Sequence, residues 1–324
     1  MKNFLRYFTG LLAAAILGFS IYGLTHTRDV LDYLALYNYE PPAQIVKLAD
    51  ETSMNDKTRK VFYVNRPDLQ DKSSFKNSCV KQEETIVLGC YVENTGIFLL
   101  KVDDPRLDGI IEVTSAHEVL HAMYDRLSDE ERAQVDKMTA KFFDNLKNDR
   151  IKSNVENYRK RDPSVVPNEL HSILATEVRD LSPELEAYYS RYFKDRKAVV
   201  GLSEKYEETF IRLEDQVQAY RSQLDNLRKS LDANEQQVNS LGGQVDVERK
   251  RLDDQLNSGQ VEEYNAGVAG FNGLVNRYNA LIQARKSMIA EYNRIVELYN
   301  DVASTEADLL ESLQVQPIQT QEGR

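Results

Sequence analysis

Two histidines with a glutamate beside the first lie in the segment Thr114–Asp125, which reads TSAHEVLHAMYD. His117 and His121 are four residues apart, so on a helix both side chains project from one face, one turn apart. Two imidazoles at this spacing can bind one Zn²⁺ at about 2.0–2.1 Å. Glu118 lies beside that face, where its carboxylate can take a proton from a zinc-activated water without binding the metal. The spacing predicts a hydrolytic zinc centre with Glu118 as general base, and an ordinary amphipathic helix is the alternative.

A catalytic zinc usually has three protein ligands and one open position, so one more ligand must come from elsewhere in the chain. The sequence after His121 has no H-x-x-G-x-x-H continuation that would supply a third histidine. The segment NELHSILATEVRDL, residues 168–181, predicts a later helix with two acidic candidates, Glu169 and Glu177. They are eight residues apart, which places them about 80° apart around a helix and on the same side. The residues alone leave both glutamates as candidates for the third metal ligand.

The pattern HEVLH, followed by a glutamate-bearing helix, resembles the gluzincins, which are zincin metallopeptidases with a glutamate as third ligand. The resemblance covers roughly residues 60–195. It implies zinc as the cofactor and hydrolysis of peptide bonds as the activity. It also implies Glu169 rather than Glu177 as the third metal ligand, because the segment Glu169-Leu170-His171-Ser172 is similar to the third-ligand helix of small members.

The resemblance further implies residues that support the ligands and the transition state. Position 173 is Ile where the longer gluzincin signature N-E-x-x-x-D has Asp, so Asp180 is expected to accept a hydrogen bond from a ligand histidine instead. The family fold places a strand at the cleft edge before the motif helix, where an extended peptide pairs with it. Residues 96–102 (GIFLLKV) occupy that place in the chain. A donor for the developing oxyanion is also needed, and the candidates are Tyr158, His171, Tyr188 and Tyr189.

The elements that must position these residues indicate an α+β fold. Three runs of β-branched and aromatic residues predict strands, and the last two predict a hairpin; they are residues 60–65 (KVFYVN), 85–94 (TIVLGCYVEN) and 96–102 (GIFLLKV). Helices are predicted from about Leu107 to Leu127, from the capping box at Ser128, and after Asn168 as cap. We therefore expect a small zincin-like metallopeptidase domain over residues 28–200, with a short antiparallel sheet and active-site helices.

From about residue 210 the composition of the chain changes. A heptad pattern of apolar residues then holds across about six heptads. Asn234 lies at a core position of this pattern, where such a residue can fix the register. Residues 256–260 (LNSGQ) predict a turn, and a second heptad run rich in tyrosine follows. We expect an antiparallel coiled-coil hairpin over residues 201–314, with a parallel dimer as the alternative, and a disordered tail over residues 315–324.

The N-terminus predicts a membrane anchor. Residues 7–27 contain no Asp, Glu, Lys or Arg, and these 21 residues are close to the ~20 needed to cross a bilayer. Lys2 and Arg6 precede them, which places the N-terminus in the cytoplasm and the rest of the chain outside. No convincing cleavage site follows, so an uncleaved anchor over the first 27 residues is expected rather than a signal peptide. In an exported chain, Cys79 and Cys90 are expected to form a disulfide.

The charge balance of the chain limits the classes of partner that it can bind. The chain has 324 residues and a net charge of −11, from 52 acidic and 41 basic residues. Such a chain is a poor match for nucleic acid, which needs clustered Lys and Arg. The sequence therefore predicts a membrane-anchored, extracytoplasmic zinc peptidase that acts on a peptide or protein, with a protein partner or self-association through the coiled coil. The alternative is a structural or scaffolding coiled-coil membrane protein with a vestigial or structural zinc site.

Overall fold

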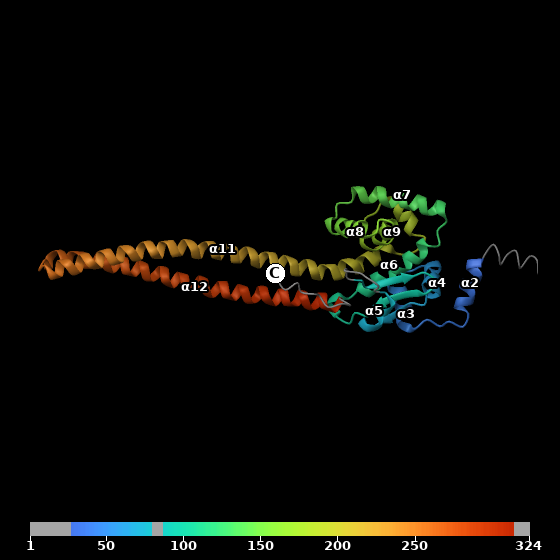
Figure 1. Ribbon diagram of the computed structural model, residues 1–324, viewed down its shortest axis with the longest axis horizontal. Coiled ribbons are helices and arrows are strands. Elements are labelled where there is room, and N and C mark those ends of the chain that lie inside the picture. Colours follow the sequence, from blue (N-terminus) through green and yellow to red (C-terminus); the bar gives the residue numbers. More distant parts are fainter. Residues whose placement is uncertain (1–26, 80–86, 314–324) are drawn as a thin grey trace, which may run out of the picture. The chain divides into compact units, whose positions relative to one another are not determined.

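A computed structural model of the chain describes residues 27–79 and 87–313, which are mostly helical with one small sheet (Figure 1). The class is α+β. The helices are α2 (Thr27–Leu36), α3 (Ala43–Glu51), α4 (Asp56–Val64), α5 (Lys72–Ser78), the 3₁₀ helix η1 (Pro105–Leu107), α6 (Ile110–Tyr124), α7 (Asp129–Asn145), α8 (Asp149–Arg161), α9 (Val166–Glu177), α10 (Pro183–Tyr189), α11 (Arg196–Asn257) and α12 (Val261–Leu313). Two compact units result: the first includes the residues up to Glu208 and those from Glu311 onward, and the second comprises Thr209–Leu310.

The sheet has three strands, β1 (Asp68–Gln70), β2 (Gly89–Val92) and β3 (Gly96–Leu100), in the order β1-β3-β2. The predicted hairpin is present, because β2 and β3 pair antiparallel around a turn in which Asn94 has a positive φ of 57°. The sheet is mixed rather than purely antiparallel, since β1 pairs parallel with β3. Residues 96–102 contribute the central strand β3, so the strand that lines the cavity is β2 and not, as expected, β3.

Residues 60–65, predicted as a strand, belong instead to helix α4. The Asn55 side chain caps this helix by accepting a hydrogen bond from the backbone N–H of Thr58. Thr58, Val61 and Phe62 are the buried positions, which is a helical spacing and not the alternation of a strand. The cap and the tertiary burial outweigh the β propensity of the run KVFYVN.

Helices α6 and α9 form the centre of the first unit. Eleven of the 15 residues of α6 are buried, and this helix packs against α3, α4, α9, β2 and β3. Helix α9 begins at Val166 with Pro167 in its first turn. Asn168 therefore lies inside the helix, and the prediction that it caps the helix is wrong. The core between the two helices includes Leu120, Ile173 and Leu174.

The second unit is a hairpin of the long helices α11 and α12, joined by a turn in which Gly259 has a φ of 75°. The antiparallel hairpin expected from the heptads is present. The side chain of Asn234 is buried in the seam and donates a hydrogen bond to the carbonyl oxygen of Leu281 on the facing helix, at 3.2 Å. Arg221 likewise donates to the Tyr299 hydroxyl across the hairpin.

The predicted disulfide between Cys79 and Cys90 is confirmed, with Cα atoms 5.8 Å apart. It ties the C-terminal end of α5 to β2. Within the described residues, no helix is long and apolar enough to cross a membrane. The anchor predicted over residues 7–27 lies, except for its last residue, outside the described part of the chain, as does the tail predicted over residues 315–324.

Gly109 starts the helix that carries the histidines, and we predict that Gly109→Ala destabilises the first unit. Its φ is 100°, and a Cβ there would lie 2.8 Å from the carbonyl oxygen of Leu202. Such strain costs on the order of 1–3 kcal/mol, so the urea midpoint should fall and amide exchange in α6 should accelerate. Gly201→Ala is the control, because its nearest neighbour would be an Arg179 nitrogen at 3.7 Å. Equal effects of the two changes would contradict this role of Gly109.

Candidate metal centre

His117 and His121 project from one face of α6, as their spacing predicts. Their ring centroids are 4.7 Å apart and their planes are nearly perpendicular, at 80°. Only 18% of the His117 side chain and 11% of the His121 side chain are exposed. Both rings lie at the surface of one cavity.

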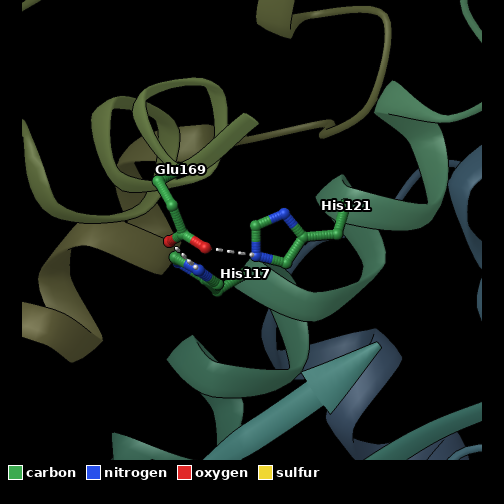
Figure 2. Close-up of side chains that lie close together, drawn as sticks. All are labelled: His117, His121 and Glu169. Carbon is green, nitrogen blue, oxygen red and sulfur yellow. Dashed lines mark ion pairs between the residues drawn. The ribbon is translucent and has the colours of Figure 1, made fainter. Parts of the chain in front are cut away.

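Glu169 completes the group from the first turn of α9. Its Oε2 lies 3.5 Å from Nε2 of His117, and its Oε1 lies 3.6 Å from Nε2 of His121. Figure 2 shows the carboxylate and the two imidazoles pointing toward one another from the two helices. The potential ligand atoms of all three residues lie within 4.8 Å of one another, so this group could hold a metal ion. In residues 27–79 and 87–313 it is the one such group of three.

Asn168 orients one of the imidazoles. Its Oδ1 lies 2.9 Å from Nδ1 of His121, and an amide oxygen can only accept a hydrogen bond. The contact therefore favours the tautomer of His121 with its proton on Nδ1, which leaves the lone pair of Nε2 directed at Glu169. The first turn of α9 thus supplies both an acidic ligand candidate and the acceptor that orients His121. The sequence predicted Asn168 as a helix cap and not as a partner of His121.

The carboxylate of Glu169 is electrostatically matched to cations. Burial raises its pKa, but the neighbouring imidazoles of His117 and His121 lower it by more, so the net shift is downward. Its Oε2 is buried and has no hydrogen-bond partner, since 3.5 Å to His117 is too long for an ordinary hydrogen bond. A buried acceptor without a donor is costly, and a cation between the carboxylate and the imidazoles would remove that cost.

The three residues line a cavity of about 570 Å³, together with Glu118. Glu118 is buried, with 6% of its surface exposed, and it faces strand β2. A Cβ at Gly89 would lie 2.8 Å from Cγ and 2.9 Å from Oε1 of Glu118, and 2.5 Å from Cγ2 of Thr114. Only glycine therefore allows this close approach of β2 to the Glu118 carboxylate. Gly89 is a second site residue that the sequence analysis missed.

Two acidic residues considered for the site do not join the imidazoles. Glu177 lines the cavity but forms an ion pair with Arg150, at 2.9 Å. Arg150 also pairs with Glu207 at 2.7 Å and lines the same cavity, a role that the sequence did not indicate. The side chain of Asp180 is 84% exposed and pairs with Lys197, so it is not the acceptor for a ligand histidine. Asn168 occupies that position.

The candidates for an oxyanion donor separate into two groups. Tyr158 lines the cavity. His171 does not line it, because it is fully buried among tyrosines and its Nε2 lies 3.0 Å from the Tyr188 hydroxyl. Burial lowers the pKa of His171 to about 3, so its imidazole is neutral and has a structural place in the core. Tyr188 and Tyr189 belong to the same aromatic cluster and also do not line the cavity.

None of the family models, curated proteins and solved structures with which the chain was compared matches it.

We predict that Glu169→Gln weakens metal binding and that Glu177→Gln does not. Among the described residues, Glu169 alone contributes a carboxylate to the group with both imidazoles, whereas Glu177 is held by Arg150. Loss of that charge should raise the dissociation constant for Zn²⁺ by at least about 10–100-fold, measured by competition with a chromogenic chelator. Both changes are isosteric and remove one charge from the same cavity, so they are matched. The reverse order of effects would assign the third ligand to Glu177.

Proposed function

We propose that this protein is a membrane-anchored, extracytoplasmic zinc metallopeptidase. The observation that carries the proposal is the convergence of His117, His121 and Glu169 beside Glu118 at one cavity. A helix with the sequence HEVLH supplies three of these residues, and a separate helix supplies the fourth. This set of residue types in this order is what the gluzincin mechanism requires.

Zinc fits the donor set better than the hard cations do. Two imidazole nitrogens and one carboxylate are the ligands of many catalytic zinc sites, in which a fourth position stays open. Calcium and magnesium prefer oxygen ligands. When bound, zinc would act as a Lewis acid on a carbonyl group and lower the pKa of a water molecule to about 7. His117, His121 and Glu169 would hold it, and Asn168 would keep Nε2 of His121 available.

Glu118 would move the proton. Its carboxylate lies at the cavity beside the metal ligands, without being one of them. In this position an oxygen of Glu118 can take a proton from the attacking water and then pass it to the amine that leaves. Strand β2 limits the positions open to this carboxylate through the close approach of Gly89. A fixed general base is catalytically more effective than a mobile one, because the reacting atoms are already aligned.

Strand β2 is suited to bind an extended peptide. Among the described residues it pairs with β3 alone, so its other edge has no ladder partner there. Gly89, Cys90 and Tyr91 line the cavity, which places that edge beside the metal ligands. A peptide added along β2 would make backbone hydrogen bonds that do not depend on its sequence. Tyr158 lines the same cavity and is our candidate for the donor to the oxyanion.

Glu118→Gln should abolish most peptidase activity while leaving zinc binding intact. The amide retains the shape of the side chain but cannot accept the proton, so kcat should fall by about 10²–10⁴-fold. The full chain, reconstituted in lipid vesicles, would be assayed on fluorogenic peptide libraries, with zinc content measured in parallel. Glu112→Gln is the matched control, because Glu112 lies on the same helix outside the cavity. Full activity of Glu118→Gln would favour the scaffolding alternative.

Gly89→Ala should lower activity without removing the metal. The new methyl group would displace either β2 or the Glu118 carboxylate, whereas His117, His121 and Glu169 lie on other elements. A displacement of this size should reduce kcat on the order of 10²-fold, while zinc affinity and the far-UV circular dichroism stay at the wild-type values. Gly201→Ala serves again as the control. Unchanged kcat would show that β2 does not constrain the general base.

A further inference from the structure

Helix α2 exposes the apolar part of its surface, which is the reverse of an ordinary surface helix. Large hydrophobic side chains of α2 and the residue after it are 37–65% exposed: Val30, Leu31, Tyr33, Leu34 and Tyr37. At 100° per residue they fall within an arc of about 160°. A contiguous exposed apolar face of this kind marks an interaction site.

The opposite side of α2 is polar and holds the helix on the domain. Asp32 is 5% exposed, and its carboxylate accepts hydrogen bonds from both terminal nitrogens of Arg126, at 2.8 and 3.0 Å. Arg28 donates to the carbonyl oxygen of Asp125, and Arg66 donates to that of Ala35. A buried carboxylate with a bidentate guanidinium partner fixes the rotation of the helix. The apolar face is therefore directed outward by specific contacts.

The chain that precedes α2 indicates what this face contacts. Residues 7–27 carry no Asp, Glu, Lys or Arg, and the last of them, Thr27, already belongs to α2. With this run in a bilayer, the residues of α2 that follow it lie at the membrane surface. Tyrosine and leucine are favourable there, because tyrosine is enriched at the level of the headgroups and leucine enters the acyl boundary.

We propose that the apolar face of α2 lies in the surface of the lipid bilayer and orients the first unit on the membrane. The inference rests on the membrane anchor of the proposed function, but not on the peptidase activity. Its consequence concerns the substrate. Arg126, which holds α2, is five residues after His121 and lies just beyond the C-terminal end of α6. Helix α2 is thus attached at the end of the helix that carries the two histidines, so the metal site would face membrane-proximal segments of polypeptides.

A tryptophan in α2 tests the proposal, because the natural chain contains none. Leu34→Trp would be introduced into the full chain, which is then reconstituted in phosphatidylcholine vesicles. Leu34 is 60% exposed, so the larger side chain fits without repacking. Lipids brominated near the glycerol end of the acyl chains should quench this tryptophan by about half or more, and lipids brominated near the bilayer centre should quench it less. Arg159→Trp on α8 is the control, expected to be quenched by aqueous iodide only.

The outcomes are distinguishable. Quenching of Trp at position 34 by the shallow bromolipid, without quenching at position 159, supports the proposal. Quenching by iodide alone, in a chain that floats with the vesicles, overturns the proposal and leaves the anchor intact. Protection from both quenchers overturns it as well, because the face is then covered by protein, either a second copy or a partner. A chain that does not float with vesicles overturns both the anchor and this proposal.

Discussion

The structure depends on one buried carboxylate oxygen, Oε2 of Glu169 on α9, which has no hydrogen-bond partner. It lies 3.5 Å from Nε2 of His117 on α6, and Oε1 of the same carboxylate lies 3.6 Å from Nε2 of His121. A buried acceptor without a donor is costly unless a cation or a proton lies beside it. The packing of the two helices nevertheless holds the carboxylate and the imidazoles in place. A metal ion with an open coordination position would turn this cost into binding energy and make the rest of the cavity chemically useful.

Helix α6 connects the candidate metal site with helix α2. Its central residues carry the imidazoles and Glu118, and β2 lies against it at Gly89. Directly after its C-terminus, Asp125 and Arg126 hold α2, whose apolar face is directed outward. A largely buried helix has little room to move, so the position of the general base and the orientation of α2 depend on the same element. The proposed chemistry and the proposed membrane contact therefore depend on one local fold.

Features that depend on residue spacing could be predicted from the sequence, whereas features that depend on packing between elements could not. The two imidazoles, the β2–β3 hairpin and the coiled coil follow from spacing within single elements, and these predictions agree with the structure. Glu169 and Glu177 share one side of a helix, so spacing left both open; the resemblance implied Glu169, and the packing of α9 on α6 places that residue beside the imidazoles. Asp180 was expected beside a histidine, but Asn168 is there, because the first turn of α9 faces His121. Residues 60–65 formed a helix because a cap and burial outweighed local propensity.

X-ray absorption at the zinc edge, on the full chain with one equivalent of Zn²⁺, tests whether His117, His121 and Glu169 bind the ion. Binding at this group predicts four or five nitrogen and oxygen ligands at about 2.0–2.2 Å. Multiple scattering should indicate two imidazoles, and one of the oxygen ligands should disappear in Glu169→Gln. A shell of six oxygens without imidazole scattering would contradict the account, because the ion would then be bound away from His117 and His121.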